Sequence, residues 1–232
     1  MTAPAKVLID VWSDVMCPWC IIGYSQLRQG LDSLSGEIEA ELRWHAFQLN
    51  PDMPEEGEEQ QAHLARKYGR TPEQMAAARG QMKEIAAQAG YSFDYTGAGE
   101  PPEARLWNTR RAHQLLLWTL AQHGATRQTE LKLALFDAHF QQRRNVSDPQ
   151  VLIDIASSLG IDPAAAEAAL DSPVLAQQVL EEQRMAHDMN VTGVPAMLVN
   201  GKYLIPGAQD PATYANALRR VVAREAQLAA QR

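Results

Sequence analysis

Residues 7–30, VLIDVWSDVMCPWCIIGYSQLRQG, contain the only two cysteines of the chain, Cys17 and Cys20. The six residues at 7–12 form a short, β-branched and mostly apolar run, which predicts a buried strand. From Cys17 onward the apolar residues keep helical spacing. The cysteine pair is therefore predicted to lie where a strand passes into a helix.

This predicted position favours thiol chemistry. The first N–H groups of a helix have no partner within it, and the helix dipole favours negative charge there. We therefore expect Cys17, at the helix entrance, to have a lowered pKa and to be the nucleophile. Pro18 suits the first helical position, where a missing N–H costs little. Cys20, one turn further in, is expected to be shielded and to resolve the mixed disulfide that such exchange produces.

Zinc binding and inert burial are the alternatives for a C-x-x-C pair. A zinc site needs about four ligands, but the sequence has no second cysteine pair, and its 6 histidines form no H-x-x-x-H type of cluster. Buried cysteines are common, yet two at this spacing between a strand and a helix are typical of a redox site. We expect no metal and no resident cofactor.

Composition and charge limit the partners. The 232 residues suffice for one large domain or for a domain with an insertion. Lys and Arg number 21 and Asp and Glu 28, and no basic block is present, which argues against a nucleic-acid partner. No apolar run reaches the roughly 18 residues that span a bilayer, and the start MTAPAKVLID lacks the signal-peptide pattern. We therefore expect a cytoplasmic protein with no membrane partner, in a compartment where structural disulfides are unusual.

A second strand is predicted at 37–47, where Leu42, Trp44 and Ala46 share one face. His45 lies on the other face and is left without a role, because an isolated histidine on a strand more often packs than reacts. The next segment, 54–183, has a helical pattern almost throughout, and the acidic run at 55–59 is expected to begin a solvated helix. Several helix starts carry a capping residue followed by proline: Thr71, Asp148, Asp162 and Ser172.

Two features of this helical segment have open interpretations. The helix after Thr71 carries methionines on one face, which we interpret as core filling, with a peptide-binding groove as the alternative. The loop at 90–103 holds Tyr91, Phe93 and Tyr95. This loop either borders the redox site or is pinned to the surface below by its rings.

Strand character returns at 191–199, and Asn200-Gly201 is a strong hairpin signal before a second strand. Pro195 fits this run if the strand begins there or lies at an edge, and a cis peptide bond after Val194 would also accommodate it. A last amphipathic helix is predicted after Asp210-Pro211.

Three motifs together resemble the DsbA-like thioredoxin-fold oxidoreductases, with the closest likeness to the FrnE-type branch. They are CPWC at 17–20, WHAFQLNP at 44–51, and TGVP at 192–195 followed by the hairpin. The resemblance covers essentially the whole chain. It implies an α/β thioredoxin fold with a large all-helical insertion. The implied limits are a discontinuous thioredoxin-like domain at 1–53 and 184–232 and a helical insertion domain at 54–183.

The resemblance also implies the activity, that of a protein dithiol-disulfide oxidoreductase or isomerase. Cys17 would attack, Cys20 would resolve, and Trp19 would tune the pair. Pro195 would be cis and close to the cysteines, and Val194 would pair its backbone with an extended substrate. The implied partners are proteins or small molecules that carry a thiol or disulfide, with glutathione as a redox partner, and the protein would be a monomer or homodimer.

The chain departs from the better-known thioredoxin pattern at one position. The buried carboxylate expected six residues before the first cysteine is replaced by Val11. Asp10 or Asp14 is expected to take its role, or a water molecule to move the proton. We therefore count Asp14, with Pro18 and Trp19, as support for the active site.

Two other classes of function stay open. Glutathione-dependent enzymes of the kappa transferase or hydroxychromene-carboxylate isomerase type share this fold, but they typically have serine where Cys17 stands and do not need Cys20. Glutathione binding without a reversible internal disulfide would favour that class. A chaperone-like binding module is the second alternative, and protection of clients after loss of both cysteines would identify it.

Overall fold

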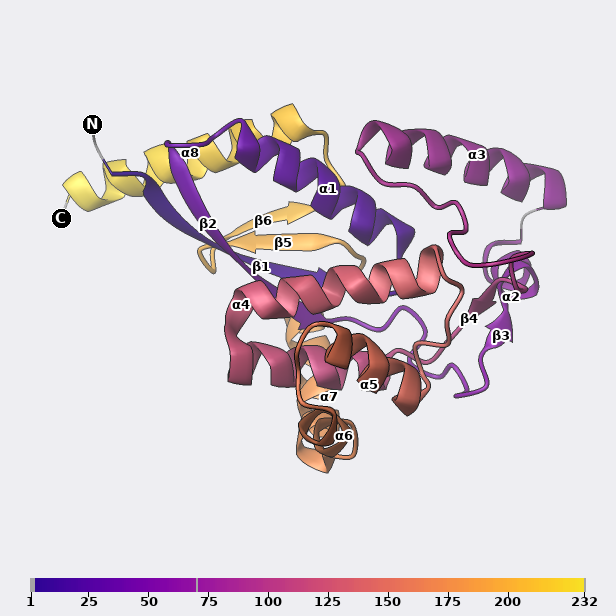
Figure 1. Cartoon of the computed structure of the whole chain (residues 1–232). Coiled ribbons are helices and arrows are strands. Elements are labelled where there is room, and N and C mark those ends of the chain that lie inside the picture. Colours follow the sequence, from indigo (N-terminus) through magenta and orange to yellow (C-terminus); the bar gives the residue numbers. More distant parts are fainter. Residues whose placement is uncertain (1–2, 70, 232) are drawn as a thin grey trace.

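The computed structural model describes residues 3–69 and 71–231 (Figure 1). The chain begins with β1 (Ala5–Ser13), α1 (Pro18–Asp32) and β2 (Ile38–Ala46). It ends with β5 (Ala196–Val199), β6 (Tyr203–Pro206) and α8 (Pro211–Ala230). Between them come β3 (Glu58–Glu59), α2 (Gln60–Tyr68), α3 (Pro72–Gln88), β4 (Arg105–Leu106), α4 (Arg110–Phe140), α5 (Pro149–Ser158), α6 (Pro163–Leu170) and α7 (Pro173–Asp188). Within the described residues no helix is long and apolar enough to cross a membrane.

The central sheet joins the two ends of the chain. Its order is β2-β1-β5-β6, with β1 parallel to β2 and the other pairs antiparallel. The register places Val11 beside both Trp44 and Met197. α1 and α8 lie side by side against this sheet, and α4 to α7 lie on the other side of it in Figure 1. This is the expected thioredoxin fold with helices inserted between β2 and β5.

The predicted helix starts are confirmed where a capping residue precedes proline. Thr71 and Gln74 form a reciprocal capping box at the start of α3. The side chains of the other predicted caps each accept a backbone N–H of the following helix: Asp148, Asp162, Ser172 and Asp210. Each cap satisfies a donor that the helix itself leaves free, which explains why these short patterns locate helix starts reliably.

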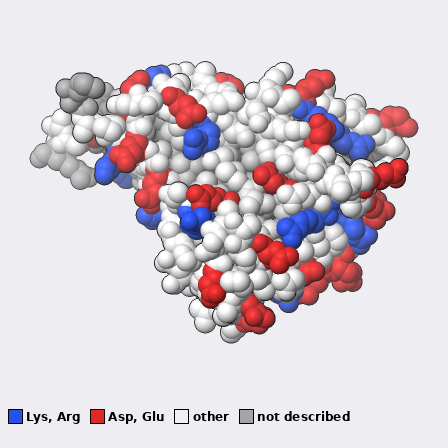
Figure 2. All heavy atoms as spheres, in the orientation of Figure 1, with Lys and Arg blue, Asp and Glu red and all other residues white. Residues whose placement is uncertain are grey.

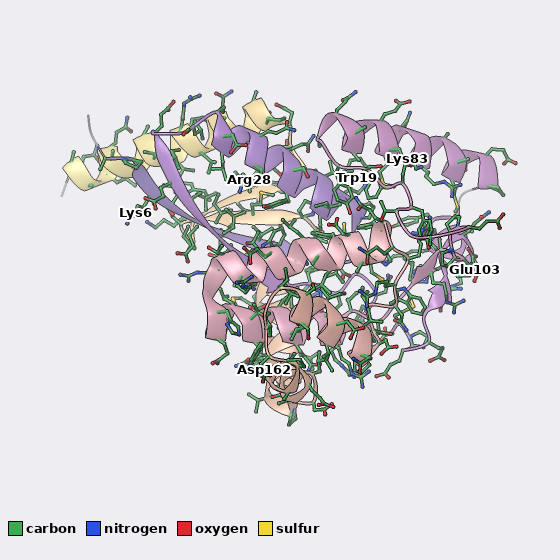
Figure 3. All side chains as sticks on the ribbon, in the orientation of Figure 1. Lys6, Trp19, Arg28, Lys83, Glu103 and Asp162 are labelled. Atoms are coloured by element: carbon green, nitrogen blue, oxygen red, sulfur yellow. The ribbon has the colours of Figure 1, made fainter. Side chains whose placement is uncertain are left out.

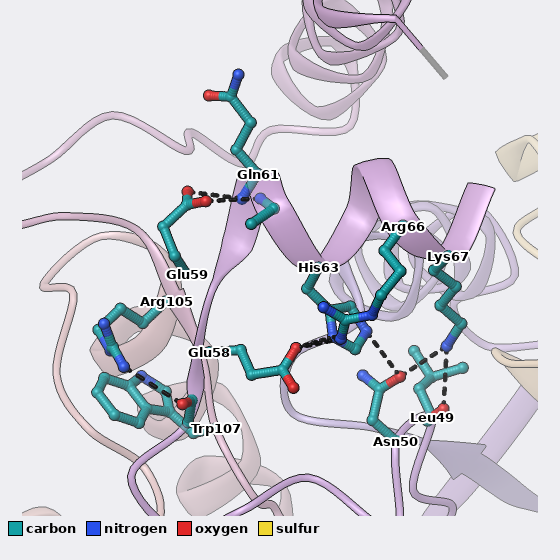
Figure 4. A network of polar contacts seen from close by, with 12 residues as sticks. Leu49, Asn50, Glu58, Glu59, Gln61, His63, Arg66, Lys67, Arg105 and Trp107 are labelled. Atoms are coloured by element: carbon teal, nitrogen blue, oxygen red, sulfur yellow. Dashed lines mark hydrogen bonds and ion pairs between the residues drawn. The ribbon is translucent and has the colours of Figure 1, made fainter. Parts of the chain in front are cut away.

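The helix predicted at the acidic run 55–59 begins directly after it, at Gln60, with Glu59 as its N-cap. Glu58 and Glu59 themselves form the short strand β3, which pairs with β4. The Glu59 carboxylate accepts the N–H groups of Gln61 and Ala62 and so caps α2 from outside. Figure 4 shows Glu58 turned toward His63, with its Oε2 atom 2.6 Å from His63 Nδ1. Local partners for these carboxylates therefore end the strand and start the helix after it.

The chain also departs from a regular helix or strand at two places. α4 begins at Arg110 and reverses direction at Gly124, whose φ of 82° is open to glycine without steric cost. The two arms of α4 lie together, since Gln128 Nε2 donates to the Leu116 carbonyl at 3.2 Å. The strand pattern at 191–199 becomes a strand only at Ala196, directly after Pro195.

The helices also cover the open edge of the sheet. β2 is an edge strand, and Gln128 of α4 replaces a neighbouring strand there. It accepts the Trp44 N–H at 2.9 Å and donates to the Trp44 carbonyl at 2.7 Å. Further along, Glu182 accepts the Ala46 N–H at 2.5 Å. The helical segment is thus bonded to the sheet, and its limits at 54 and 183 as a separate domain stay a prediction, with positions 1, 2, 70 and 232 outside the described residues.

Candidate active site

The cysteine pair lies at the predicted junction of β1 and α1. Cys17 is the residue before the first turn of α1, with extended backbone angles, and Pro18 occupies the first helical position. The Cys17 N–H donates to the Asp14 carbonyl at 3.1 Å, which tightens the turn out of β1. Both thiols are free and buried, whereas the side chain of Trp19 between them is 40% exposed. The turn therefore presents Trp19 to the surface and holds both sulfurs just beneath it.

The segment before β5 meets Cys17. The Val194–Pro195 peptide bond is cis, as predicted. The Cys17 Sγ atom lies 3.7 Å from the Val194 carbonyl oxygen, so the thiol can donate a hydrogen bond to that oxygen. Gly23 of α1 permits this approach, because a Cβ atom at that position would lie 2.9 Å from Pro195 Cγ. The structure thus brings Cys17 together with Val194 and Pro195, although Val194 lies 177 residues further along the chain.

A lysine that the sequence interpretation missed lies behind the cysteines. Lys132 of α4 is completely buried, and its Nζ atom is 3.4 Å from the Ser13 carbonyl oxygen. The ammonium also lies 5.4 Å from the ring of Trp44 and 5.1 Å from that of Phe136. Burial lowers the pKa of Lys132 to about 8, against the opposing attraction of Cys20, Asp14 and Cys17. The site therefore contains one buried cation close to the sulfurs.

Asp14 is the buried carboxylate of the site. Its Oδ2 atom accepts the Leu49 N–H at 2.8 Å, and its Oδ1 atom lies 3.5 Å from His113 Nε2. Burial opposes the charge of Asp14, but the contacts with His113 and Leu49 and the charge of Lys132 keep its pKa below the ordinary value. Burial also lowers the pKa of His113. Asp14 is therefore the negative group and His113 the neutral one.

Asp10 and Asp14 are the two carboxylates expected to replace the one missing at Val11, and they have different surroundings in the structure. Asp10 Oδ1 lies 2.9 Å from His45 Nε2, in a contact that also includes Glu182. Asp14, by contrast, acts on the ionisation of Cys17 through its charge. Of the two candidates, the structure brings Asp14 to the cysteines.

The two thiols ionise as a coupled pair. Interaction with Cys20, together with burial, raises the pKa of Cys17. Burial also opposes the charge of Cys20, but the Cys17 hydrogen bond and the Lys132 charge bring the pKa of Cys20 below its ordinary value. The expectation that Cys17 itself has the lowered pKa is wrong in the free dithiol. The pair loses its first proton readily and its second with difficulty.

The sequence does contain a signal that could have identified Lys132. Gln128, Lys132 and Phe136 are spaced by four residues, and all three are fully buried on one face of α4. A polar and a charged residue on an otherwise apolar helical face is an unusual pattern, because such groups are seldom buried without a partner. Because these residues lie far from Cys20 in the sequence, the pattern alone does not identify Cys20 as the partner of Lys132.

The structure bears on both open interpretations, that of the aromatic loop at 90–103 and that of the methionine face of α3. The Tyr91 hydroxyl donates to Asp137 at 3.0 Å, so this ring pins the loop to α4. Phe93 instead lines a cavity that extends to Pro18, as does Met82 of the methionine face. Among residues 3–69 and 71–231, no group of three or more His, Cys, Asp or Glu side chains could hold a metal ion.

Comparison with known proteins identifies the family to which the chain belongs. A family model described as a DSBA-like thioredoxin domain matches residues 8–219. An uncharacterised Bacillus subtilis protein, YwbO, is 23% identical over 205 residues, which are 87% of this chain and 90% of that protein. The thiol:disulfide interchange protein DsbA of Pectobacterium carotovorum is 35% identical over 71 residues, 31% of this chain and 34% of its own. That match therefore spans about a third of the DsbA protein.

A similar solved structure is that of a probable DsbA oxidoreductase from Streptomyces coelicolor. The two share 26% sequence identity with a TM-score of 0.79. The likeness covers 92% of this chain and 89% of that one. The similarity thus extends through both the sheet and the inserted helices.

Proposed function

The chain belongs to the DsbA-like thioredoxin domain family, whose members are disulfide oxidoreductases or isomerases, and we propose that it exchanges disulfides through Cys17 and Cys20. One observation carries this proposal. Two free thiols lie at the start of α1, and the Sγ atom of Cys17 is 3.7 Å from the carbonyl oxygen that precedes the cis-proline. Both thiols fit exchange chemistry, because each can bond to the other or to a substrate sulfur.

Cys17 is the attacking residue in the proposed reaction, since it is 4% exposed against 1% for Cys20 and lies beside Val194. Cys20 first holds the negative charge and accepts the Cys17 proton as the Cys17 sulfur bonds to one sulfur of the substrate disulfide. The substrate S–S bond breaks, and the departing thiolate takes the proton from Cys20. The Cys20 thiolate then attacks the Cys17 sulfur and releases the second substrate sulfur as a thiolate. The reverse sequence oxidises a substrate dithiol.

Lys132 and Asp14 have supporting roles in this proposal. The buried ammonium stabilises the thiolate of Cys20, because charges interact strongly where water is excluded. Asp14 balances the lysine and holds the turn before Cys17 through its contact with Leu49. Neither side chain exchanges sulfur, so both are positioning residues.

The substrate side of the site is formed by exposed Trp19 and by the backbone at Val194. An extended chain can bond to free backbone groups beside a sheet, which supports the proposed role of Val194 for a protein substrate. The CPWC and TGVP motifs support placement in the FrnE-type branch and, with it, a cytoplasmic compartment and glutathione as a redox partner.

The first test compares two single substitutions in a disulfide-exchange assay. Cys17→Ser is expected to abolish exchange, because the attacking sulfur is lost. Cys20→Ser is expected to accumulate mixed disulfides at Cys17, which intact-mass measurement detects, because the resolving thiol is lost. Equal exchange rates in Cys17→Ser and the parent protein would refute the proposal.

A redox titration separates the proposed activity from the glutathione-transferase class. The parent protein is equilibrated with mixtures of reduced and oxidised glutathione, alkylated and weighed. We expect a reversible loss of two hydrogen atoms as Cys17 and Cys20 join. Glutathione adducts without an internal disulfide would instead favour the transferase or isomerase alternative.

A further inference from the structure

A cavity of about 480 Å³ lies beside the cysteine motif. Its walls come from the start of α1 at Pro18, from α3, from the loop before β4, and from the end of α4. Figure 3 shows Trp19 at the start of α1 and Lys83 on α3, the two elements that meet at this cavity. A substrate bonded to Cys17 would therefore have this space next to it.

The cavity is cationic in an acidic protein. Its lining includes four basic residues and no Asp or Glu: Arg79, Lys83, Arg105 and Arg143. The whole chain carries a net charge of −7. Figure 2 shows basic side chains over α3 and in the region of β4 and α5, with acidic side chains both next to them and elsewhere on this face. The concentration of positive charge at the cavity is thus a local feature that attracts anions.

Two of these four cations already have acidic partners at the rim. Lys83 Nζ lies 3.1 Å from Asp94, and Arg105 Nη1 lies 3.2 Å from Glu103. The Arg105 guanidinium is also held over the Trp107 ring, as Figure 4 shows, at 5.4 Å from its centroid. Arg79 and Arg143 form no ion pair with the part of the chain that the structure describes. Both are therefore available to a ligand.

The inner end of the cavity contains polar atoms that lack partners. His139 is 5% exposed, and its Nδ1 atom forms no hydrogen bond with the described residues. The Nε atom of Arg143 is also buried and unbonded. Burial lowers the pKa of His139 to about 4, so this ring is neutral and offers either a donor or an acceptor. A buried guanidinium N–H without an acceptor is costly, which points to an acceptor supplied by a ligand.

The backbone of Arg143 adds to this observation. Its φ is 56°, in the left-handed region that a long side chain seldom occupies. This conformation follows directly after α4, where the Arg144 N–H donates to the Ala138 carbonyl at 2.8 Å. The turn thereby carries Arg143 toward the cavity that Phe140 and His139 also line.

We propose that the cavity binds a carboxylate carried by the disulfide substrate close to its exchanging sulfur. Arg143 and Arg79 pair with the carboxylate, and the rings of Phe93, Trp107 and Phe140 cover the carbon chain that joins it to the sulfur. This inference rests on the proposed exchange activity and names the class of substrate for it. A small thiol with carboxylates, such as glutathione, and an acidic peptide share this chemistry.

The test uses three small symmetric disulfides that differ in charge. The reduced protein is mixed with dithiodiglycolate, hydroxyethyl disulfide or cystamine, which are anionic, neutral and cationic, and the rate of exchange is measured at neutral pH. We expect the anionic disulfide to react about tenfold faster than the cationic one at low salt, with the difference reduced at high salt. Equal rates, or a preference for cystamine, would overturn the inference.

Substitutions then locate the effect. Arg143→Gln and Arg79→Gln each remove one charge from the cavity, and the second lies on the exposed face of α3, where folding does not depend on it. Each is expected to slow exchange with dithiodiglycolate about three- to tenfold and to slow exchange with hydroxyethyl disulfide by a clearly smaller factor. Arg224→Gln, on the exposed face of α8, is the matched control and should change neither rate.

The outcomes separate this inference from the exchange activity itself. If the parent protein fails to react with the neutral disulfide, the proposed function fails. If exchange is normal but Arg224→Gln slows the anionic reaction as much as Arg143→Gln does, then general charge attraction explains the preference for the anionic disulfide and the inference about the cavity fails. Glutathione disulfide and peptide disulfides with Asp or Asn beside the cysteine identify the natural source of the carboxylate. Insensitivity of all these reactions to Arg143→Gln would overturn the inference.

Discussion

Two histidine–carboxylate contacts, at Asp10 and Asp14, lie only four residues apart in the chain and have opposite charge states. Burial lowers the pKa of His45, but its hydrogen bonds to Asp10 and Glu182 raise it to about 9. At the second contact burial lowers the pKa of His113, and Asp14 does not restore it. His45 is therefore charged at neutral pH, whereas His113 is neutral.

The difference comes from the other charges around each ring. His45 faces two carboxylates, at 2.9 Å and 2.7 Å, and stacks on Trp12 with ring centroids 4.7 Å apart. His113 faces one carboxylate and is opposed by the charge of Lys132. The first contact thus holds β1, β2 and α7 together, while the second leaves the positive charge on Lys132, next to Cys20. Similar side chains serve stability in one place and thiol ionisation in the other.

The largest expected effect is that of Asp14→Asn. This change removes the carboxylate that balances the buried Lys132 charge, and it keeps a side chain that can still accept the Leu49 N–H. We expect the free energy of unfolding to fall by about 3 kcal/mol, as when one partner of a buried ion pair is lost. Urea denaturation of the reduced protein measures it.

Asp32→Asn is the control for that substitution, because the Asp32 side chain is 70% exposed and its ion pair with Arg28 is long, at 3.7 Å. Its unfolding curve should match that of the parent protein. Equal stability of the two variants would show that Asp14 does not balance the charge of Lys132.

His45→Gln tests the first contact through its pH dependence. Because the pKa of His45 is about 9 in the folded state and about 6.5 in the unfolded state, its contribution is complete below pH 6.5 and is lost as the pH rises through 9. The parent protein should exceed His45→Gln in stability by roughly 2 to 3 kcal/mol near pH 6 and by little near pH 10. A difference that stays constant over this range would contradict a charged His45.

Lys132→Met tests the second contact through the ionisation of the cysteine pair, where the expected shift is the smallest of these effects. Without the ammonium, the pH midpoint for alkylation of the cysteine pair should rise by about one pH unit. Below that midpoint the fraction of thiolate should therefore fall about tenfold. The pKa of His113, followed by NMR, should also rise, because the opposing charge of Lys132 is gone. Lys202→Met is the control, since the Lys202 side chain is 64% exposed on the distant hairpin.

An unchanged alkylation midpoint in Lys132→Met would remove the lysine from the proposed mechanism. A raised midpoint without a shift at His113 would mean that the lysine acts on Cys20 but not on the histidine. The pKa of His45 should stay the same in either case, which keeps the two contacts distinguishable.

The sequence was sufficient for features that depend on neighbouring residues. The strand before Cys17, the helix that begins at Pro18, and the capped starts at Thr71 and Asp148 all follow from local hydrogen bonds and spacing. At the acidic run 55–59 the helix start also followed from a local bond, the Glu59 cap of α2. The strand at Glu58 did not follow, because its strand partner, Leu106, lies far along the chain.

The sequence by itself determined where the cysteine pair lies, because a strand, two cysteines and a helix entrance lie within one short segment. Only the tertiary structure decided which charges surround that pair. Lys132 comes to Cys20 and Arg143 to the cavity beside Pro18 because α4 folds back at Gly124 and packs against the sheet. Interactions between charges depend on distance in space and on exclusion of water, and neither is visible in the order of residues.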